Sequence, residues 1–230
     1  MNHINKKQEP QKFVNWKLRH PNANFKQLPS NVKKALQNSL LDEQGYVCCF
    51  CGSSLGKIDY QGAIIQAPLS KGDNHNIRVA HIEPQSVNIS LSLDYSNICA
   101  SCDSSLDGEE HCDIAQRAQC LPVSPLEQDC LSFFSFDILG NIYPNKDKSD
   151  NEQKMANETI KILGLQAPSL VLKRQKAINI LLKAIEMNAC LLDSDHIEKI
   201  MQKDINGLFM EFYFVIYKYI KDNMNKINSN

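Results

Sequence analysis

The sequence predicts an α+β protein with a mixed front half, a β-hairpin and a helical back half. Paired cysteines and short β-branched runs occur before about residue 145, whereas apolar residues at helical spacing take over from about residue 152. A hydrophobic fraction of 43% is ordinary for a globular chain with a real core, and 230 residues allow one or two domains. We expect two units, 1–150 and 151–230, divided near the polar stretch NKDKSDNEQK.

Capping and turn-forming residues, together with the spacing of apolar residues, predict the elements of the front half. PSNVKKALQNSLLDEQG is typical of a helix, with Ser30 as its N-cap and Gly45 as its end. Residues 56–76 are expected to form a loop, and NIRVAHIEP to form a short strand that ends near Pro84. LSFFSFDILGNIYP alternates in polarity around Gly140, which predicts a hairpin.

In the back half, two stretches carry apolar residues at helical spacing, 170–185 and 205–220. The second stretch also carries aromatic side chains, including Tyr213 and Tyr217, on its other face. A helix that is apolar all round is either interior or shared between two bodies. Both readings are open: a core helix, or a helix that docks on a partner or a second copy.

The cellular compartment decides how the nine cysteines are interpreted. The opening MNHINKKQEPQK lacks the apolar segment of a signal peptide, and no run of eighteen apolar residues suggests a membrane span. We therefore expect a cytoplasmic protein with no membrane contact. Thiols stay reduced in that compartment, so paired cysteines indicate metal ligands in preference to disulfides.

Two separated cysteine clusters indicate a structural zinc site. Cys48 and Cys51 form a Cys-x-x-Cys knuckle, and NICASCDSSLDGEEHC offers Cys99, Cys102 and Cys112 for the other half. The competing interpretation is buried free thiols, because free cysteine is often a small core residue. Three further cysteines have no such neighbours and are expected in the core or at the surface: Cys120, Cys130 and Cys190.

Charge is unevenly distributed, although the net charge is −1. Residues 1–35 hold eight Lys or Arg against Glu9 alone, while residues 79–113 hold seven Asp or Glu and no Lys or Arg. A basic arm beside an acidic segment suits a nucleic acid held by one and a cation held by the other. On charge alone, two solvated surfaces are the simpler explanation of the pattern.

The segment between the cysteine clusters adds candidates for catalysis. VAHIEP brings His81 to the end of a strand, and YSNICASC brings Asn97 sixteen residues later. This order, with cysteine pairs on both sides, resembles the HNH nuclease family. The resemblance implies a ββα-metal (His-Me finger) core, in which a strand-borne His, a loop Asn and a third ligand on a helix surround one divalent cation.

The resemblance implies a role for His81, for Asn97 and for each metal ion in phosphodiester hydrolysis. His81 is the general base that takes a proton from water, and Asn97 holds the His-bearing loop or contacts the metal. A catalytic Mg²⁺ or Mn²⁺ neutralises the transition state, while zinc replaces the core that so small a unit cannot build. The chemistry serves DNA or RNA substrates equally, tRNA included.

Two departures from the family pattern leave ligands open. Ala80 stands where many members carry a metal-binding acid or His, and Glu83 is the candidate substitute. A longer gap after Cys102 moves the third HNH position to His111, favoured for its imidazole, or to Asp113, a harder oxygen ligand. Measured from Asn97 against the family, we expect the zinc set Cys48, Cys51, Cys102 and Cys112, with Cys99 as the alternative to Cys112.

A narrower resemblance extends over residues 38 to about 178. LLDEQGYVCCFCG, HIEPQS, NICASC, HCDIAQ, the hairpin and ILGLQAPSLVLKRQKAI together look like PtuB, the HNH subunit of Septu and retron-associated antiphage systems. This implies a partner ATPase, PtuA, and in a retron system a reverse transcriptase with its RNA and DNA. A separate ATPase is consistent with the absence of a phosphate loop from this sequence, because GSSLGKI resembles such a loop but lacks its spacing.

Two further function classes remain open. A catalytically degenerate HNH-fold zinc protein would bind nucleic acid or act as a scaffold, and Ala80 would mark its degenerate site. A thiol redox protein would use Cys48 and Cys51, although no βαβ pattern surrounds them.

Overall fold

The computed structural model describes the chain except residues 60, 62–63, 66–73, 189–193 and 228–230. It confirms the α+β class. The α-helices of the described residues are α1 (Gln11–Arg19), α2 (Ser30–Gln44), α3 (Asp113–Gln116), α4 (Asp150–Ile162), α5 (Pro168–Asn188), α6 (Ser194–Ile200) and α7 (Tyr213–Ile227). The strands are β1 (Lys57–Ile58), β2 (Ile64–Ile65), β3 (Asn74–His75), β4 (Ile77–His81), β5 (Ile98–Cys102), β6 (Phe134–Phe136) and β7 (Ile142–Pro144).

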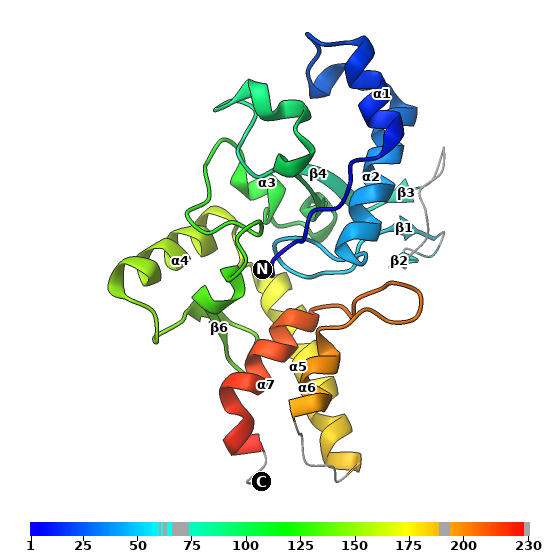
Figure 1. Ribbon diagram of the computed structural model, residues 1–230. Coiled ribbons are helices and arrows are strands. Elements are labelled where there is room, and N and C mark those ends of the chain that lie inside the picture. Colours follow the sequence, from blue (N-terminus) through cyan, green and yellow to red (C-terminus); the bar gives the residue numbers. More distant parts are fainter. Residues whose placement is uncertain (60, 62–63, 66–73, 189–193, 228–230) are drawn as a thin grey trace.

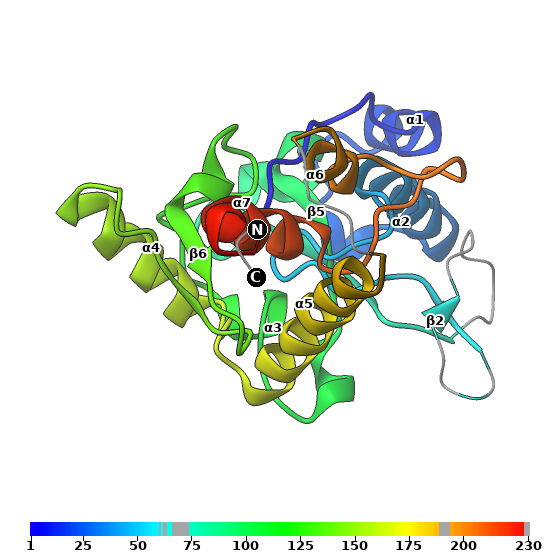
Figure 2. The same ribbon diagram turned by 90° about the horizontal axis from the view of Figure 1, so that it is seen from below.

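The elements gather around a hydrophobic core that both halves of the sequence share. Helices α1 and α2 lie together at one end of the molecule, and α5, α6 and α7 lie at the other (Figure 1). Seen along the perpendicular direction, α7 lies near the centre and α4 projects to one side (Figure 2). One buried cluster contains Leu36 and Leu40 of α2, Ile98 of β5 and Phe214 and Ile220 of α7. The described part of the chain has no helix that is long and apolar enough to cross a bilayer.

Helix α2 leads into the first cysteines, as the sequence predicts. It buries Leu36, Leu40 and Leu41, and it ends at Gly45, which adopts φ 62° and donates its N–H to the carbonyl of Leu41. A Cβ at Gly45 would lie 2.5 Å from Cδ2 of Phe209, so only glycine suits the turn. The predicted N-cap at Ser30 is wrong by one position, because the helix begins there and the cap residue is proline 29, without a side-chain cap.

In the part of the chain that the structure describes, the strands form three small antiparallel sheets. In the central pair, β4 and β5 align from Ile77 opposite Cys102 to His81 opposite Ile98. The hairpin predicted around Gly140 is confirmed, with β6 paired to β7 and Gly140 at φ 84°. The expectation of a plain loop over 56–76 is wrong in its described part, where β1 pairs with both β2 and β3.

The back half is helical, but α7 begins later than the periodicity predicts. Residues 205–212 lie outside the helix, and Ile205 is fully exposed at 101%. Left-handed backbone at Gly207 (φ 79°) and Phe212 (φ 57°) interrupts the helical path. Tyr213 packs inside the chain, at 4% exposure, and stacks on Phe209 with ring centroids 4.1 Å apart.

Candidate functional site

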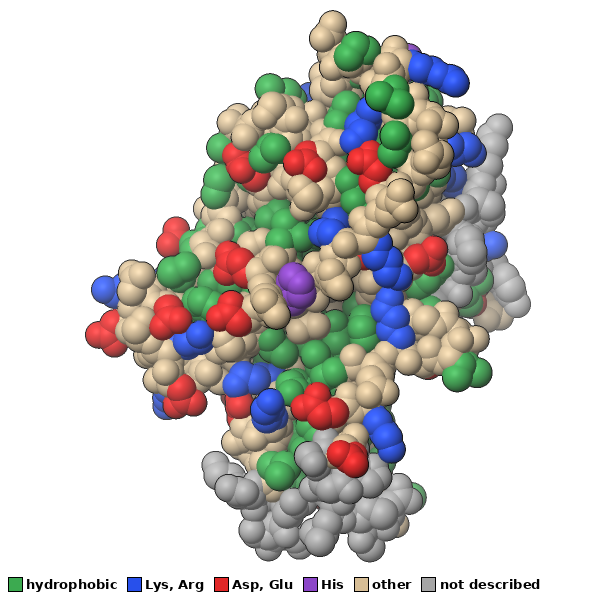
Figure 3. Space-filling model, in the orientation of Figure 1, with side chains coloured by type: hydrophobic (Ala, Val, Ile, Leu, Met, Phe, Trp, Pro, Cys, Tyr) green, Lys and Arg blue, Asp and Glu red, His purple; other side chains and the backbone are tan. Residues whose placement is uncertain are grey.

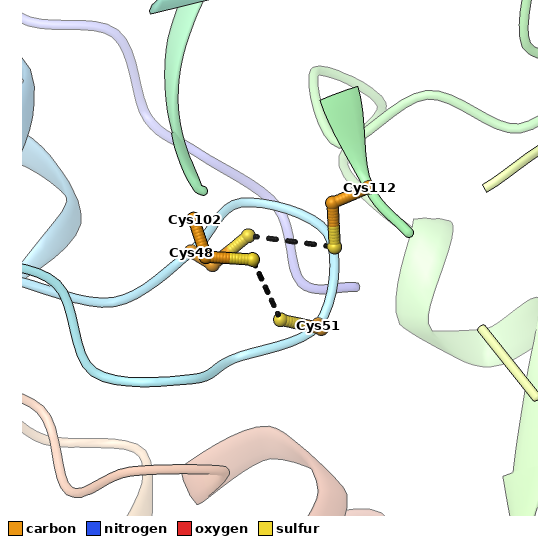
Figure 4. Close-up of side chains that lie close together, drawn as sticks. All are labelled: Cys48, Cys51, Cys102 and Cys112. Atoms are coloured by element: carbon orange, nitrogen blue, oxygen red, sulfur yellow. Dashed lines mark hydrogen bonds between the residues drawn. The ribbon is translucent and has the colours of Figure 1, made fainter. Parts of the chain in front are cut away.

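Four cysteines converge in the interior. The sulfur atoms of Cys48, Cys51, Cys102 and Cys112 all lie within 4.8 Å of one another, and all four side chains are buried. Cys48 and Cys51 come from the loop after α2, Cys102 ends β5 and Cys112 precedes α3, and their sulfurs point toward one another (Figure 4). The structure therefore brings together the four cysteines of the expected zinc set.

The local backbone explains this convergence. The knuckle closes through the N–H of Cys48 bonding to the carbonyl of Ser53 (2.9 Å) and the N–H of Gly52 bonding to the carbonyl of Cys48 (3.1 Å). Gly52 adopts φ 85°, and a Cβ there would lie 2.8 Å from the ring of Phe214. Cys112 also has positive φ, at 57°, and its N–H bonds to the carbonyl of Leu163.

Distances and electrostatics both suit a tetrahedral dication. The Sγ atoms of Cys48 and Cys112 are 3.9 Å apart, and those of Cys51 and Cys102 are 3.7 Å apart. Zinc–sulfur bonds of about 2.3 Å in a tetrahedron place sulfurs about 3.8 Å apart, whereas a disulfide needs about 2.0 Å. Burial, then the neighbouring thiols, raises the pKa of Cys112 well above its ordinary value, so that thiol ionises readily only beside a cation. The buried cluster can thus hold a structural metal such as zinc.

The other cysteines that the structure describes lie outside the cluster. Cys99 is buried and neighbours Cys49, so the structure does not place it as the alternative to Cys112. Cys130 is buried and Cys120 is exposed. Cys190 lies outside the described residues.

His111 belongs to the cysteine cluster and not to a groove with His81. Its side chain is fully buried, with Nδ1 3.3 Å from the sulfur of Cys112 and 3.7 Å from that of Cys102. Ser104 fixes the backbone here, because its hydroxyl donates to the carbonyl of His111 and accepts the N–H of the same residue. The favoured third HNH position thus lies away from His81, while the alternative, Asp113, faces it.

His81 lines an open groove of about 850 Å³ between α2 and the β4–α3 region. Basic side chains in its lining outnumber acidic ones: Lys26, Lys33, Lys34, Arg78 and Arg117 against Asp103 and Asp113. Three of the lysines belong to the basic arm of the sequence, and both aspartates belong to its acidic segment. On the face drawn in Figure 3, acidic and basic side chains are interspersed, so a basic excess is not a property of that whole face.

The hydrogen bonds of His81 define its tautomer. Nε2 lies 3.0 Å from the carbonyl oxygen of Ser92, which can only accept, so Nε2 carries the proton. Nδ1 then holds the lone pair, and the side-chain amide of Gln85 donates to it at 3.2 Å. Burial lowers the pKa of His81 below 6.5, while the Ser92 carbonyl and the charge of Asp113 oppose this. The ring is therefore neutral at neutral pH, with a basic nitrogen available.

Asn97 holds the loop that follows His81. Its Oδ1 accepts the N–H of Glu83 at 2.8 Å, and its Nδ2 donates to the carbonyl of Glu83 at 3.0 Å and to that of Leu91 at 3.4 Å. Asn97 is buried and does not line the groove, so its amide serves the backbone. The side chain of Glu83 does not line the groove either, which leaves the expected substitute for Ala80 outside it.

Arg78 and Gln85 are groove residues that sequence reasoning missed. The Nε of Arg78 donates to Oδ2 of Asp113 at 2.9 Å, and its NH1 lies 4.0 Å from Oδ2 of Asp103. The available signal was RVAHIEP, which puts an arginine on the strand of the histidine. Gln85 was hidden because its contact with Nδ1 depends on how the chain turns after proline 84.

The groove does not form a ready site for a divalent cation. Within the described parts of the chain, the four cysteines are the one place where three or more His, Cys, Asp or Glu side chains converge. Among the described residues, the carboxylates that line the groove, Asp103 and Asp113, both face Arg78, so a guanidinium lies where a cation would need free oxygens. The residues here do not fit a preformed Mg²⁺ or Mn²⁺ site.

Comparison with known proteins gives one informative relative. No model of a protein family matches the chain. The chain is 30% identical over 163 residues to a protein of Vibrio cholerae serotype O1 biovar El Tor named "Retron Vc95 putative HNH endonuclease". The match covers 68% of this chain and 71% of that protein.

Proposed function

This chain belongs to the HNH endonuclease family, and we propose that its basic groove hydrolyses phosphodiester bonds in DNA or RNA. The observation that carries the proposal is the arrangement of His81. His81 lines a groove in which the described lysine and arginine side chains outnumber the aspartates, and its Nε2 is held by the carbonyl of Ser92, which leaves Nδ1 basic. We assign the ββα core to β4, β5 and α3, which packs against β4.

The proposed reaction uses His81 as general base. A water takes the place of the Gln85 amide at Nδ1 and gives its proton to that nitrogen while its oxygen bonds to phosphorus. The bond from phosphorus to the leaving oxygen breaks, and that oxygen takes a proton from solvent. His81 later releases its proton to solvent, so one water is added overall and the ring returns to its neutral form.

The lysines of the groove are proposed to bind the nucleic acid backbone. Lys33 lies over the ring of Phe25, 5.4 Å from its centroid, and that ring meets His81 edge-on at 4.8 Å. Lys26 and Lys34 line the same side of the groove. Contacts of this kind fix the backbone without reading sequence, and they make binding weaken as salt rises.

Zinc is proposed for the four-cysteine cluster, with a structural role. The cluster ties the knuckle after α2 to the end of β5 and the start of α3, so it fixes the frame on which His81 and Asp113 lie. The sequence-based expectation of a catalytic Mg²⁺ or Mn²⁺ stays a prediction, to be tested by the metal dependence of cleavage.

We propose antiphage defence as the biological setting, supported by the name of the relative, which places that protein in a retron. The expected partners are a PtuA-like ATPase and, in a retron system, the reverse transcriptase with its RNA and DNA. The helical region 151–230 is the candidate docking module, although Tyr213 itself is buried within the chain and serves its core.

A catalytically degenerate subunit is the second candidate, because a specific observation favours it. Ala80 offers no ligand, and both groove carboxylates face Arg78. Such a protein would bind nucleic acid in the groove without cleaving it.

The test is incubation of the purified chain with plasmid DNA and with total tRNA, alone and with its ATPase partner. Each reaction is run with Mg²⁺, with Mn²⁺ and without added divalent cation. Cleavage that disappears in His81→Ala protein of unchanged zinc content supports the proposal. Nucleic acid binding without cleavage under every condition would establish the degenerate alternative.

A further inference from the structure

Arg78 is the one charged side chain of the groove that both of its carboxylates face. Its Nε donates to Asp113 at 2.9 Å, and its NH1 lies 4.0 Å from Asp103. Asp113 is the first residue of α3 and Asp103 follows the end of β5, so the guanidinium has a hydrogen bond to one element and a longer ionic contact with another. An arginine held from two sides keeps a defined direction, unlike a mobile surface arginine.

The guanidinium keeps donors for a further ligand. A guanidinium has five N–H groups in a planar fork, and the bond to Asp113 uses the one on Nε. The side chain is 45% exposed, and it lines the groove together with His81. A planar fork of this kind matches two oxygens of a phosphate, which a lysine ammonium cannot do.

The neighbouring strand position explains why such a cation is needed. Ala80 is fully buried, and its methyl group cannot hold a metal next to His81. Hydrolysis adds negative charge to the phosphate as water attacks, and a positive group must neutralise it. In this groove the positive group closest to the carboxylate at α3 is Arg78.

We propose that Arg78 takes the place of the catalytic divalent cation, binding the phosphate presented to His81 and neutralising the charge that develops on it. Asp113 and Asp103 are then positioning residues that aim the guanidinium, and neither ligates a metal. This inference rests on the proposed function for its cleavage arm only, because phosphate binding by Arg78 is measurable without cleavage.

A purely structural ion pair is the competing role for Arg78. Pairs that are partly exposed usually contribute little to stability, and many contribute nothing measurable. Replacing Arg78 would then leave binding and cleavage unchanged. If Arg78 binds phosphate, its replacement should instead weaken nucleic acid binding and slow cleavage.

The first arm measures binding in a His81→Ala background, so that no cleavage interferes. The probes are a short DNA duplex and total tRNA, titrated at several salt concentrations. Adding Arg78→Ala should weaken binding by roughly tenfold, the scale of one hydrogen bond to a charged group, and should lower the salt slope by about one. Lys161→Ala on α4, outside the groove, is the matched loss of one surface charge and should change neither.

The second arm measures single-turnover cleavage at saturating protein, in buffer freed of divalent cations after zinc content has been confirmed. The wild type should cleave without Mg²⁺, Arg78→Ala should be slower by at least ~10²-fold, and Arg78→Lys should recover only part of the rate. Millimolar guanidinium should partly restore Arg78→Ala but not His81→Ala, which a structural role would not produce.

Together, the binding and cleavage measurements distinguish failure of the Arg78 inference from failure of the proposed nuclease activity. Unchanged binding and salt slope on removing Arg78 would overturn the inference, even if the wild type cleaves. Strict dependence of the wild type on Mg²⁺ would equally overturn it while leaving the proposed nuclease intact. Arg78-dependent binding without any cleavage would keep Arg78 as the phosphate ligand and reject the nuclease.

Discussion

Replacing Asn97 by alanine tests whether one buried amide holds the catalytic loop. The substitution removes the acceptor for the N–H of Glu83 and the donors to the carbonyls of Glu83 and Leu91. Glu83 lies two residues after His81, and Leu91 directly precedes Ser92, whose carbonyl fixes the imidazole tautomer. Loss of the amide therefore loosens both the loop and the base.

The magnitude follows from the contacts. Asn97 is 6% exposed, so water replaces its hydrogen bonds poorly, and an unsatisfied buried polar group costs about 1–3 kcal/mol. With bonds of 2.8 and 3.0 Å lost on one half-buried residue, Glu83, we expect the unfolding free energy to fall by about 2–4 kcal/mol. Misplacement of the base by about 1 Å costs on the order of 10²-fold in rate.

The assay is urea denaturation followed by circular dichroism at fixed excess zinc, with single-turnover cleavage measured on the same preparations. Asn88→Ala is the matched control in the same loop. Asn88 accepts from the N–H and hydroxyl of Ser90, in exposed bonds, so its loss should cost about 1 kcal/mol or less. Both variants should keep full zinc content, because neither residue contacts the cysteine cluster.

Equal stability of the two variants would refute this account of Asn97. Retention of the wild-type rate by Asn97→Ala would show that the loop holds His81 without the amide. Loss of zinc by the variant would mean that the loop and the cluster fold as one unit.

Three other predictions concern the frame of the site and its protonation. Cys51→Ser should lose zinc and several kcal/mol of folding free energy, as measured by metal analysis and solubility. Cys120→Ser, at an exposed position, is the control and should lose neither. Full zinc content in Cys51→Ser would reject the assignment. Because burial lowers the pKa of His81 below 6.5, the rise of the cleavage rate with pH should have its midpoint below pH 6.5. The unfolding free energy should fall as the pH drops below 6.5, since the unfolded chain binds that proton more readily; a midpoint above pH 6.5 would contradict the assignment. Gly140→Ala should destabilise the chain by more than Gly207→Ala. Both glycines have positive φ, but of the two only Gly140 would place a Cβ against backbone, 2.2 Å from the carbonyl oxygen of Val171. Equal melting temperatures of the two variants would disprove the clash.

Local signals in the sequence predicted the parts of the fold that depend on neighbouring residues. Gly45 ends α2 because only a residue without a Cβ suits its left-handed turn against Phe209. The hairpin at Gly140 follows from alternating polarity around a glycine with positive φ. The left-handed turn at Gly45 and the hairpin at Gly140 are both signalled by neighbouring residues, so periodicity and turn chemistry predict them, whereas the approach of Phe209 to Gly45 is long-range.

The start of α7 could not be predicted in the same way. The spacing of apolar residues over 205–220 is helical throughout, yet the chain turns at Gly207 and Phe212. Asp204 organises this turn by accepting the N–H groups of Asn206 and Leu208. Packing of Phe212 and Phe214 against the cysteine knuckle then decides where the helix begins, and that contact is long-range.

The candidate site likewise has parts that the sequence could predict and parts that it could not. The Cys-x-x-Cys spacing of Cys48 and Cys51 predicted one half of the cluster, because that spacing is a local feature, whereas the choice of Cys112 over Cys99 followed from the resemblance to the HNH family. The placement of His111 behind the cluster and of Asp113 in the groove was open, because adjacent residues leave a helix start in different directions. The grip of Asp103 and Asp113 on Arg78 joins β4, β5 and α3, and no periodicity in a single segment reports such a contact.

The most direct test of the central claim compares the two histidines that line the groove, His75 and His81. Single-turnover cleavage of DNA and tRNA is measured for His81→Ala and for His75→Ala, each at wild-type zinc content. The account predicts that His81→Ala loses at least ~10²-fold in rate while His75→Ala keeps most of it. Cleavage that survives in His81→Ala, or that fails in His75→Ala alone, would contradict the assignment of His81 as the general base.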